Sequence, residues 1–186
     1  MDINGMVKRA KGILLAPKQE WPVIAAEKAG HSKVVLSWLL PLSLIPAVAA
    51  VIGFGLIGYS VSWGLRHGLL QVATMIGGAY VTAFIINALA ERYASVKNLD
   101  QAFALIAYAY TPACLGGIFR IIPSLAFIGT LAGLYGLYLL YIGLPPLMQT
   151  PPEKNTGYFV VALLCTIVVF LVLSAVLAAV FITRMY

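Results

Sequence analysis

The stretch FVVALLCTIVVFLVL, residues 159–173, is apolar on all sides apart from Thr166. A helix that crosses a membrane needs about 20 predominantly apolar residues, and its backbone groups must all be hydrogen-bonded within the protein. A strand of a membrane β-barrel would instead alternate polar and apolar residues over segments of about 10 residues, and this stretch does not. It therefore predicts a transmembrane α-helix.

Four further apolar blocks precede this stretch, and Asp, Glu, Lys and Arg fall outside all five. The predicted spans are about 34–57, 68–90, 101–119, 121–144 and 158–183. Charged residues make up 10% of the chain and apolar ones 62%, whereas an ordinary soluble domain has about 25% charged residues. The sequence thus predicts an all-α polytopic membrane protein, with an N-terminal segment of residues 1–33 followed by a five-helix transmembrane domain of residues 34–186.

The charges predict the orientation of these spans. Of the 12 Lys and Arg residues, only Arg66, Arg120 and Arg184 fall on one side of the predicted membrane, and the six acidic residues lie with the other basic ones. Basic residues collect in cytoplasmic loops. We therefore expect the N-terminus in the cytoplasm and, after five spans, the C-terminus outside.

The N-terminal segment has the pattern of a short amphipathic helix. Apolar residues recur at helical spacing over residues 3–14, with lysines on the opposite side, and Pro17 ends the pattern. We expect Lys8, Arg9 and Lys11 to contact an anionic membrane surface, and Trp21 to lie at the interface. The segment can be a plain topology anchor or a docking or lipid-sensing helix, and the sequence leaves both open.

Prolines interrupt two of the predicted spans. Pro41 and Pro46 lie in the first span, and Pro112 in the third removes the backbone bond to the carbonyl of Tyr108. Thr111 or a water molecule is then expected to satisfy that carbonyl. Such a kink can be a hinge in a transport cycle or a static packing feature.

The fourth span is rich in glycine and tyrosine. Gly129 and Gly133 form a small-xxx-small pair, which predicts a face where another backbone approaches closely. Tyr135, Tyr138 and Tyr141 carry hydroxyl groups that need partners at bilayer depth. We expect these tyrosines to form hydrogen bonds between helices, with a polar pathway as the alternative.

Two runs of sequence resemble one known family. They are YAYTPACLGG at residues 108–117 and LYGLYLLYIGLP at residues 134–145, and both are similar to the Yip1 family of five-span membrane proteins in its bacterial branch. The upstream LAPKQEW of residues 15–21 is similar to that branch's cytoplasmic lead-in. The positions that match the family pattern or are expected to support packing are Tyr108, Tyr110, Pro112, Gly129, Gly133, Gly136, Tyr138, Tyr141, Gly143 and Pro145.

The resemblance implies a location and a set of partners. A bacterial Yip1 relative is expected in the inner membrane, with the lipid bilayer, a membrane protein or a second copy as its partner. Eukaryotic members associate with Rab-type GTPases, but this chain lacks their Asp-Leu-Tyr-Gly-Pro element and their long cytoplasmic N-terminus. Rab binding is therefore not implied here, and nucleic acid is not expected as a partner.

Three classes of function remain on the sequence alone: a non-catalytic scaffold or adaptor, a small-solute transporter or channel, and an intramembrane enzyme. A non-catalytic scaffold or adaptor is favoured, because the spans lack the ionisable groups that intramembrane enzymes use. A small-solute transporter or channel is the alternative, on the strength of the kinks and of Gln71, Asn87 and Gln101. We expect no catalytic residue and no cofactor.

A soft-metal site is the remaining chemistry to weigh, because thiol and thioether groups bind Cu(I). The topology places Met75 and Cys114 in the outer third of the membrane and Cys165 in the inner third. These groups do not meet at one depth, so we expect no metal site.

Overall fold

The computed structural model describes residues 3–58 and 60–183, and all of its regular elements are helical. Five helices are long and apolar enough to cross a membrane: His31–Gly53, Val61–Tyr93, Leu99–Ile121, Phe127–Met148 and Pro152–Val172. The predicted fold class is thereby confirmed. The predicted outer position of Arg184 and the C-terminus lies outside the described residues.

The first span is built from several short helices in a row. It begins with α3 (His31–Val34), continues through a π-helical turn at Val35–Leu39 into α4 (Leu40–Ala50), and ends in a second π-helical segment at Val51–Gly58. The two wide turns lie on either side of the proline-containing α4, and π-helical turns commonly accommodate such interruptions. The predicted kinks therefore occur within a continuous helical path.

The second span starts earlier than predicted. Helix α5 (Val61–Leu89) begins just after Ser60, whose hydroxyl accepts a hydrogen bond from the backbone N–H of Trp63 at 3.3 Å. Arg66 and His67, which we had expected in an outer loop, therefore lie in the first turns of this helix. A side-chain cap at the N-terminus offsets the cost of extending the helix through two polar residues.

The third and fourth spans form a hairpin. Helices α6 (Leu99–Ala109) and α7 (Thr111–Gly116) meet at Tyr110, which confirms the predicted break around Pro112. After two short 3₁₀ turns, α8 (Ala126–Met148) runs back along them. The third span is the centre of the molecule, because 72% of its most apolar 18-residue window is buried.

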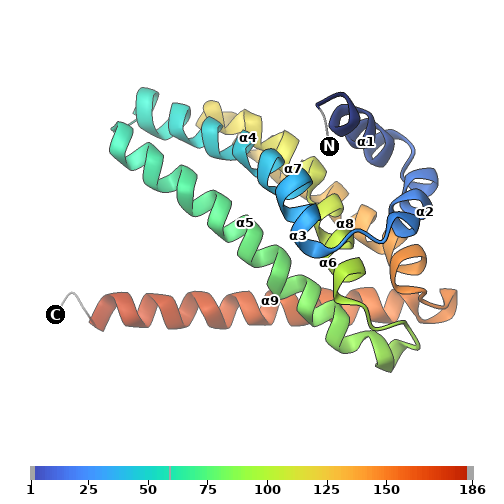
Figure 1. The fold of residues 1–186 in the computed structure, drawn as a ribbon. Helices are drawn as coiled ribbons and strands as arrows, with labels where there is room; N and C mark the ends of the chain where they lie inside the picture. The colour runs from blue at the N-terminus through green and yellow to red at the C-terminus, as the bar shows by residue number, and fades with distance from the viewer. Residues whose placement is uncertain (1–2, 59, 184–186) are drawn as a thin grey trace.

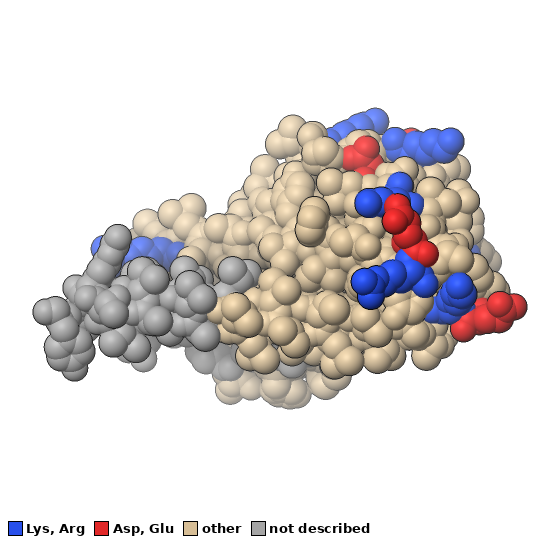
Figure 2. Space-filling view, turned by 90° about the horizontal axis from the view of Figure 1, so that it is seen from below, with Lys and Arg blue, Asp and Glu red and all other residues tan. Residues whose placement is uncertain are grey.

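The two ends of the chain pack differently. Helices α1 (Ile3–Leu15) and α2 (Pro17–Glu27) fold back over the ends of α7 and α8, whereas the long helix α9 (Pro152–Thr183) crosses beneath α5 and projects beyond the bundle (Figure 1). Only 17% of the most apolar window of the last span is buried. In Figure 2, the charged side chains on the face shown gather mainly at one end of the molecule.

Candidate functional site

Buried aromatic rings connect the N-terminal segment to the first and third spans. Tyr108 is 4% exposed, and its ring lies 4.7 Å from that of Trp38 and 6.5 Å, edge-on, from that of Trp21. Trp21 is itself 1% exposed. The predicted contact of Trp21 with the membrane surface is therefore wrong, because its ring packs inside the protein. An amphipathic pattern alone does not distinguish a lipid partner from a protein partner.

The basic residues of α1 also divide into two groups. Lys8 and Lys11 are exposed, as a membrane contact requires. Arg9 is not available for such a contact, because its side chain is 13% exposed and pairs with Glu20 at 2.7 Å and also with Glu27. This ion-pair cluster holds α1 against α2.

Glycines spaced by seven residues form one face of α8. A Cβ atom on Gly136 would lie 2.7 Å from the carbonyl oxygen of Ala109, and one on Gly129 would lie 3.1 Å from that of Gly116. Gly143 leaves room for the ring of Trp21, which a Cβ atom would approach to 2.7 Å. Glycine at these positions allows α8 to approach α6, α7 and α2 closely.

Gly133 does not belong to this face. A Cβ atom on Gly133 would meet no atom within 4 Å, so the predicted close contact through the Gly129 and Gly133 pair is wrong at Gly133. Residues four apart on a helix are turned by about 40° relative to each other, whereas residues seven apart nearly coincide. The heptad spacing of Gly129, Gly136 and Gly143 was the signal that identifies the contact face.

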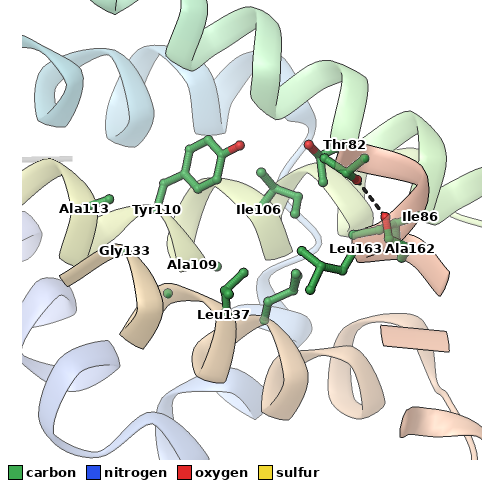
Figure 3. Close-up of a pocket in the computed structure, with 13 residues that line it drawn as sticks. Thr82, Ile86, Ile106, Ala109, Tyr110, Ala113, Gly133, Leu137, Ala162 and Leu163 are labelled. Carbon is green, nitrogen blue, oxygen red and sulfur yellow. Dashed lines mark hydrogen bonds between the residues drawn. The ribbon is translucent and has the colours of Figure 1, made fainter. Parts of the chain in front are cut away.

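Gly133 instead lines a cavity of about 190 Å³, which is drawn in Figure 3. Residues of α5, α6, α7, α8 and α9 form its walls. Its 13 lining residues include no Asp, Glu, Lys, Arg or His. Gly133, Leu137, Leu163 and Thr166 are only half-buried, so the cavity reaches the protein surface between α8 and α9. This cavity is the candidate functional site.

Three hydroxyl groups are the polar features of the cavity. Tyr110 extends from the junction of α6 and α7 with its hydroxyl toward α5, where Thr82 lies (Figure 3). The Thr82 Oγ1 atom is buried and faces the Tyr110 hydroxyl, whereas Thr166 Oγ1 donates to the carbonyl of Ala162 at 2.7 Å. A hydroxyl group has one donor and two acceptor positions, so each of these groups can offer a further hydrogen bond to a bound partner.

The described structure also shows the surroundings of two prolines in the spans, Pro145 and Pro112. Pro145 cannot donate to the carbonyl of Tyr141, and the Asn155 side chain of α9 donates to that carbonyl at 3.1 Å. At Pro112, the Thr111 hydroxyl has no hydrogen-bond partner. Thr111 therefore does not satisfy the carbonyl of Tyr108, as we predicted it could. Asn155 was missed from the sequence, although the proline showed that a donor was needed.

The tyrosines of α8 have different environments. The hydroxyls of Tyr141 and Thr156 of α9 lie 3.2 Å apart, and Tyr135 donates to the carbonyl of Leu14 at 2.8 Å, as interhelical hydrogen bonding requires. Tyr138 is 43% exposed, and its ring packs against that of Tyr135. These hydroxyl groups therefore point to different neighbours and do not line one path.

The sulfur atoms of Met75 and Cys114 are neighbours in the structure. Cys114 Sγ is 3.4 Å from Met75 Sδ, in agreement with their equal predicted depth. Among the described residues, no group of three or more His, Cys, Asp or Glu side chains is placed to hold a metal ion.

Comparison with known proteins agrees with this architecture. The model of the Yip1 domain matches residues 11–176. The chain belongs to the Yip1 family. The inner membrane protein YohC of Escherichia coli strain K12 is 28% identical over 160 residues, which cover 79% of this chain and 82% of that protein, and the same values hold for YohC of strain CFT073. No solved structure is similar to the chain.

Within a Yip1 protein, these contacts explain the residue pattern in physical terms. Tyr108 fills the centre of the bundle, Gly136 and Gly143 allow close approach to α6 and α2, and Pro145 exposes a carbonyl that fixes α9. Tyr110 and Gly133 are not fully covered by such packing contacts, and both residues line the cavity. The pattern thus combines packing positions with positions that line the cavity.

Proposed function

We propose that this Yip1 protein is a non-catalytic scaffold or adaptor of the bacterial inner membrane, which binds a transmembrane helix of another membrane protein at the cavity between α8 and α9. Such binding would affect membrane organisation or trafficking. The observation that carries the proposal is the open space at Gly133, since small residues at a helix surface are the usual point of close helix contact in membranes.

The surroundings of the cavity support a helix as the occupant. The exposed residues next to its mouth, including Leu134 at 58% and Leu164 at 56%, are apolar. The Thr82 hydroxyl gives the site one polar contact, of the kind that joins membrane helices through Ser or Thr side chains. The weakly packed α9 borders the opening and has few protein contacts to lose.

The same lining argues against solute transport. A polar or charged solute would have to give up its hydrating water on entering this cavity, which is unfavourable unless the lining replaces those interactions. The lining offers three hydroxyl groups and no Asp, Glu, Lys, Arg or His to do so. A transporter normally places such groups beside its substrate. The scaffold proposal therefore accounts for the site with fewer requirements than a transport cycle.

Site-specific photocrosslinking in native membranes tests the proposal. A photoreactive residue at Leu137, which lines the cavity, should give one discrete protein adduct, and Gly133→Leu in the same chain should abolish it by filling the site. The control position is Leu69, which is 73% exposed on α5 and should give no such adduct. Adducts that persist in Gly133→Leu would contradict the proposal, and an adduct of twice the chain mass would identify a second copy as the occupant.

We also propose that the N-terminus lies in the cytoplasm and the C-terminus outside, because of the basic-residue bias. A reporter fused after Tyr186 should then be active only outside the cytoplasm. Cytoplasmic activity of that reporter would overturn this orientation without affecting the cavity.

A further inference from the structure

A second, polar cavity of about 240 Å³ lies at the opposite end of the third span from Pro112, where α2 and α8 end and α6 begins. Lys28, Asp100, Gln101 and Gln149 are among its lining residues. The cavity lies where the membrane spans end, which is the depth of the phospholipid headgroups. Its chemistry is therefore unlike that of the apolar cavity at Gly133.

The buried amide of Gln101 has an acceptor that needs a donor. Gln101 is 8% exposed, and its Nε2 donates to the carbonyl of Ala25 at 3.2 Å, whereas its Oε1 has no hydrogen-bond partner. Exchanging the amide oxygen and nitrogen would set two oxygens against each other at Ala25, so it does not remove the problem. A bound group with N–H or O–H donors would satisfy this oxygen.

The charges around the cavity favour a cationic donor at this point. Asp100 lies beside Gln101 in the cavity lining. His31 contacts only one oxygen of the Asp100 carboxylate, Oδ1, through its backbone N at 2.8 Å and its ring Nδ1 at 2.5 Å. Two helix C-termini, those of α2 and α8, and one N-terminus, that of α6, meet at this cavity. Helix C-termini carry partial negative charge, and the N-terminal turn of α6 contains the carboxylate of Asp100. An ammonium group is the donor that matches these features.

The cavity also offers one full positive charge. Lys28 lines it from the end of α2, with a left-handed backbone at φ 44°, and Gln149 does so from the end of α8 at φ 52°. Glycine is the usual residue at such helix ends, because other residues are strained there. Lys28 and Asp100 together carry no net charge, so a zwitterion fits better than an anion or a divalent cation.

We propose that this cavity binds the phosphoethanolamine headgroup of a membrane phospholipid, with its primary ammonium at Gln101 Oε1 and Asp100 and its phosphate at Lys28. The proposal is independent of the partner site at Gly133. It explains why a buried glutamine oxygen has no partner within the chain and why lysine stands at a left-handed position.

Lipid-dependent thermal shift of the purified, delipidated full chain in detergent tests the proposal. Dioleoylphosphatidylethanolamine should raise Tm with a half-maximal concentration about tenfold below that of dioleoylphosphatidylcholine, because the quaternary ammonium of the choline lipid has no N–H to donate to Gln101 Oε1. Dioleoylphosphatidylglycerol, which has no ammonium group, should behave like the choline lipid. Equal shifts with all three lipids would overturn the proposal.

Two variants locate the effect. Lys28→Asn keeps a residue that tolerates the left-handed backbone while removing the charge, and Gln101→Met removes the acceptor while keeping the side-chain length. Gln101→Met should lose the preference for the ethanolamine lipid, and Lys28→Asn should raise the half-maximal concentration of all three lipids, because each carries the phosphate that Lys28 contacts. Lys18→Asn, on the exposed surface of the same helix α2, should change neither. If Gln101→Met does not fold, Lys28→Asn decides the outcome, and an unchanged half-maximal concentration of the ethanolamine lipid in it overturns the proposal. An equal Tm shift from soluble phosphoethanolamine would overturn the assignment to a lipid.

Discussion

The N-terminal segment and the last span differ in which neighbours their apolar side chains meet. The N-terminal segment, with its lysines and prolines, is expected to lie on the membrane surface, yet Ile13 and Trp21 are 0% and 1% exposed inside the protein. The last span is among the most apolar parts of the chain, yet only 17% of its apolar window is buried. The apolar side chains of the N-terminal segment therefore contact protein, whereas many of those in the last span are left to contact lipid.

The difference teaches that hydropathy predicts the depth of a segment in the membrane and leaves its neighbours open. Lipid tails are as apolar as leucine, so no hydrophobic force drives α9 into the bundle. The α2 segment lies at the end of the spans, where burying an aromatic ring is favourable and specific pairs such as Trp21 and Tyr108 can form. Packing and hydrogen bonds decide what the apolar pattern does not.

The largest effect is expected from removing the ring that ties the N-terminal segment to the bundle. Trp21→Ala leaves a cavity next to Tyr108 and should lower the free energy of unfolding by about 3–5 kcal/mol, as for other large-to-small changes at buried aromatics. Reversible unfolding in mixed detergent micelles measures this change. Trp63→Ala, at a ring that is 43% exposed, is the matched control and should cost far less. Equal losses would mean that Trp21 is not part of the core.

A matched glycine pair on α8 tests the helix that lies between the two ends. Gly136→Ala places a Cβ atom 2.7 Å from the carbonyl oxygen of Ala109 and should cost about 1–3 kcal/mol through overpacking. Gly133→Ala meets open space and should instead add up to about 1 kcal/mol, because alanine is the better helix former. Thermal unfolding in detergent distinguishes the two. A loss of stability in Gly133→Ala would place a close helix contact at Gly133 after all.

How much of this could be predicted depends on which forces leave a mark in the sequence. The five spans follow from apolar length, and the break at Pro112 follows from its missing N–H. The contact face of α8 could not be told from hydropathy, since a helix in lipid is apolar on every side. The burial of Trp21 and the orphaned oxygen of Gln101 depend on folding between distant segments, which a single sequence does not record.

The attachment of the weakly buried α9 can be sharpened with a double-mutant cycle. Asn155→Ala removes the donor to the carbonyl of Tyr141 and should cost about 1 kcal/mol, near the typical value for a hydrogen bond. In a Pro145→Ala background, the restored backbone N–H can reach that carbonyl, so the same change should cost less. Unfolding of all four proteins gives the coupling energy. Additive effects would show that the Asn155 side chain does not compensate for the proline.

The smallest effect concerns the ion pairs that hold α1 against α2. Arg9→Gln removes its contacts with Glu20 and Glu27 and should lower the free energy of unfolding by about 0.5–1 kcal/mol, because partly exposed ion pairs contribute little. The loss should shrink in 1 M salt, where the screening length falls to about 3 Å. Lys8→Gln, at an exposed lysine on the same helix, should leave stability unchanged but weaken binding to anionic vesicles. If Arg9→Gln weakened vesicle binding as much as Lys8→Gln and left stability unchanged, Arg9 would face the membrane, and the N-terminal segment would lie on the surface as its sequence pattern predicts.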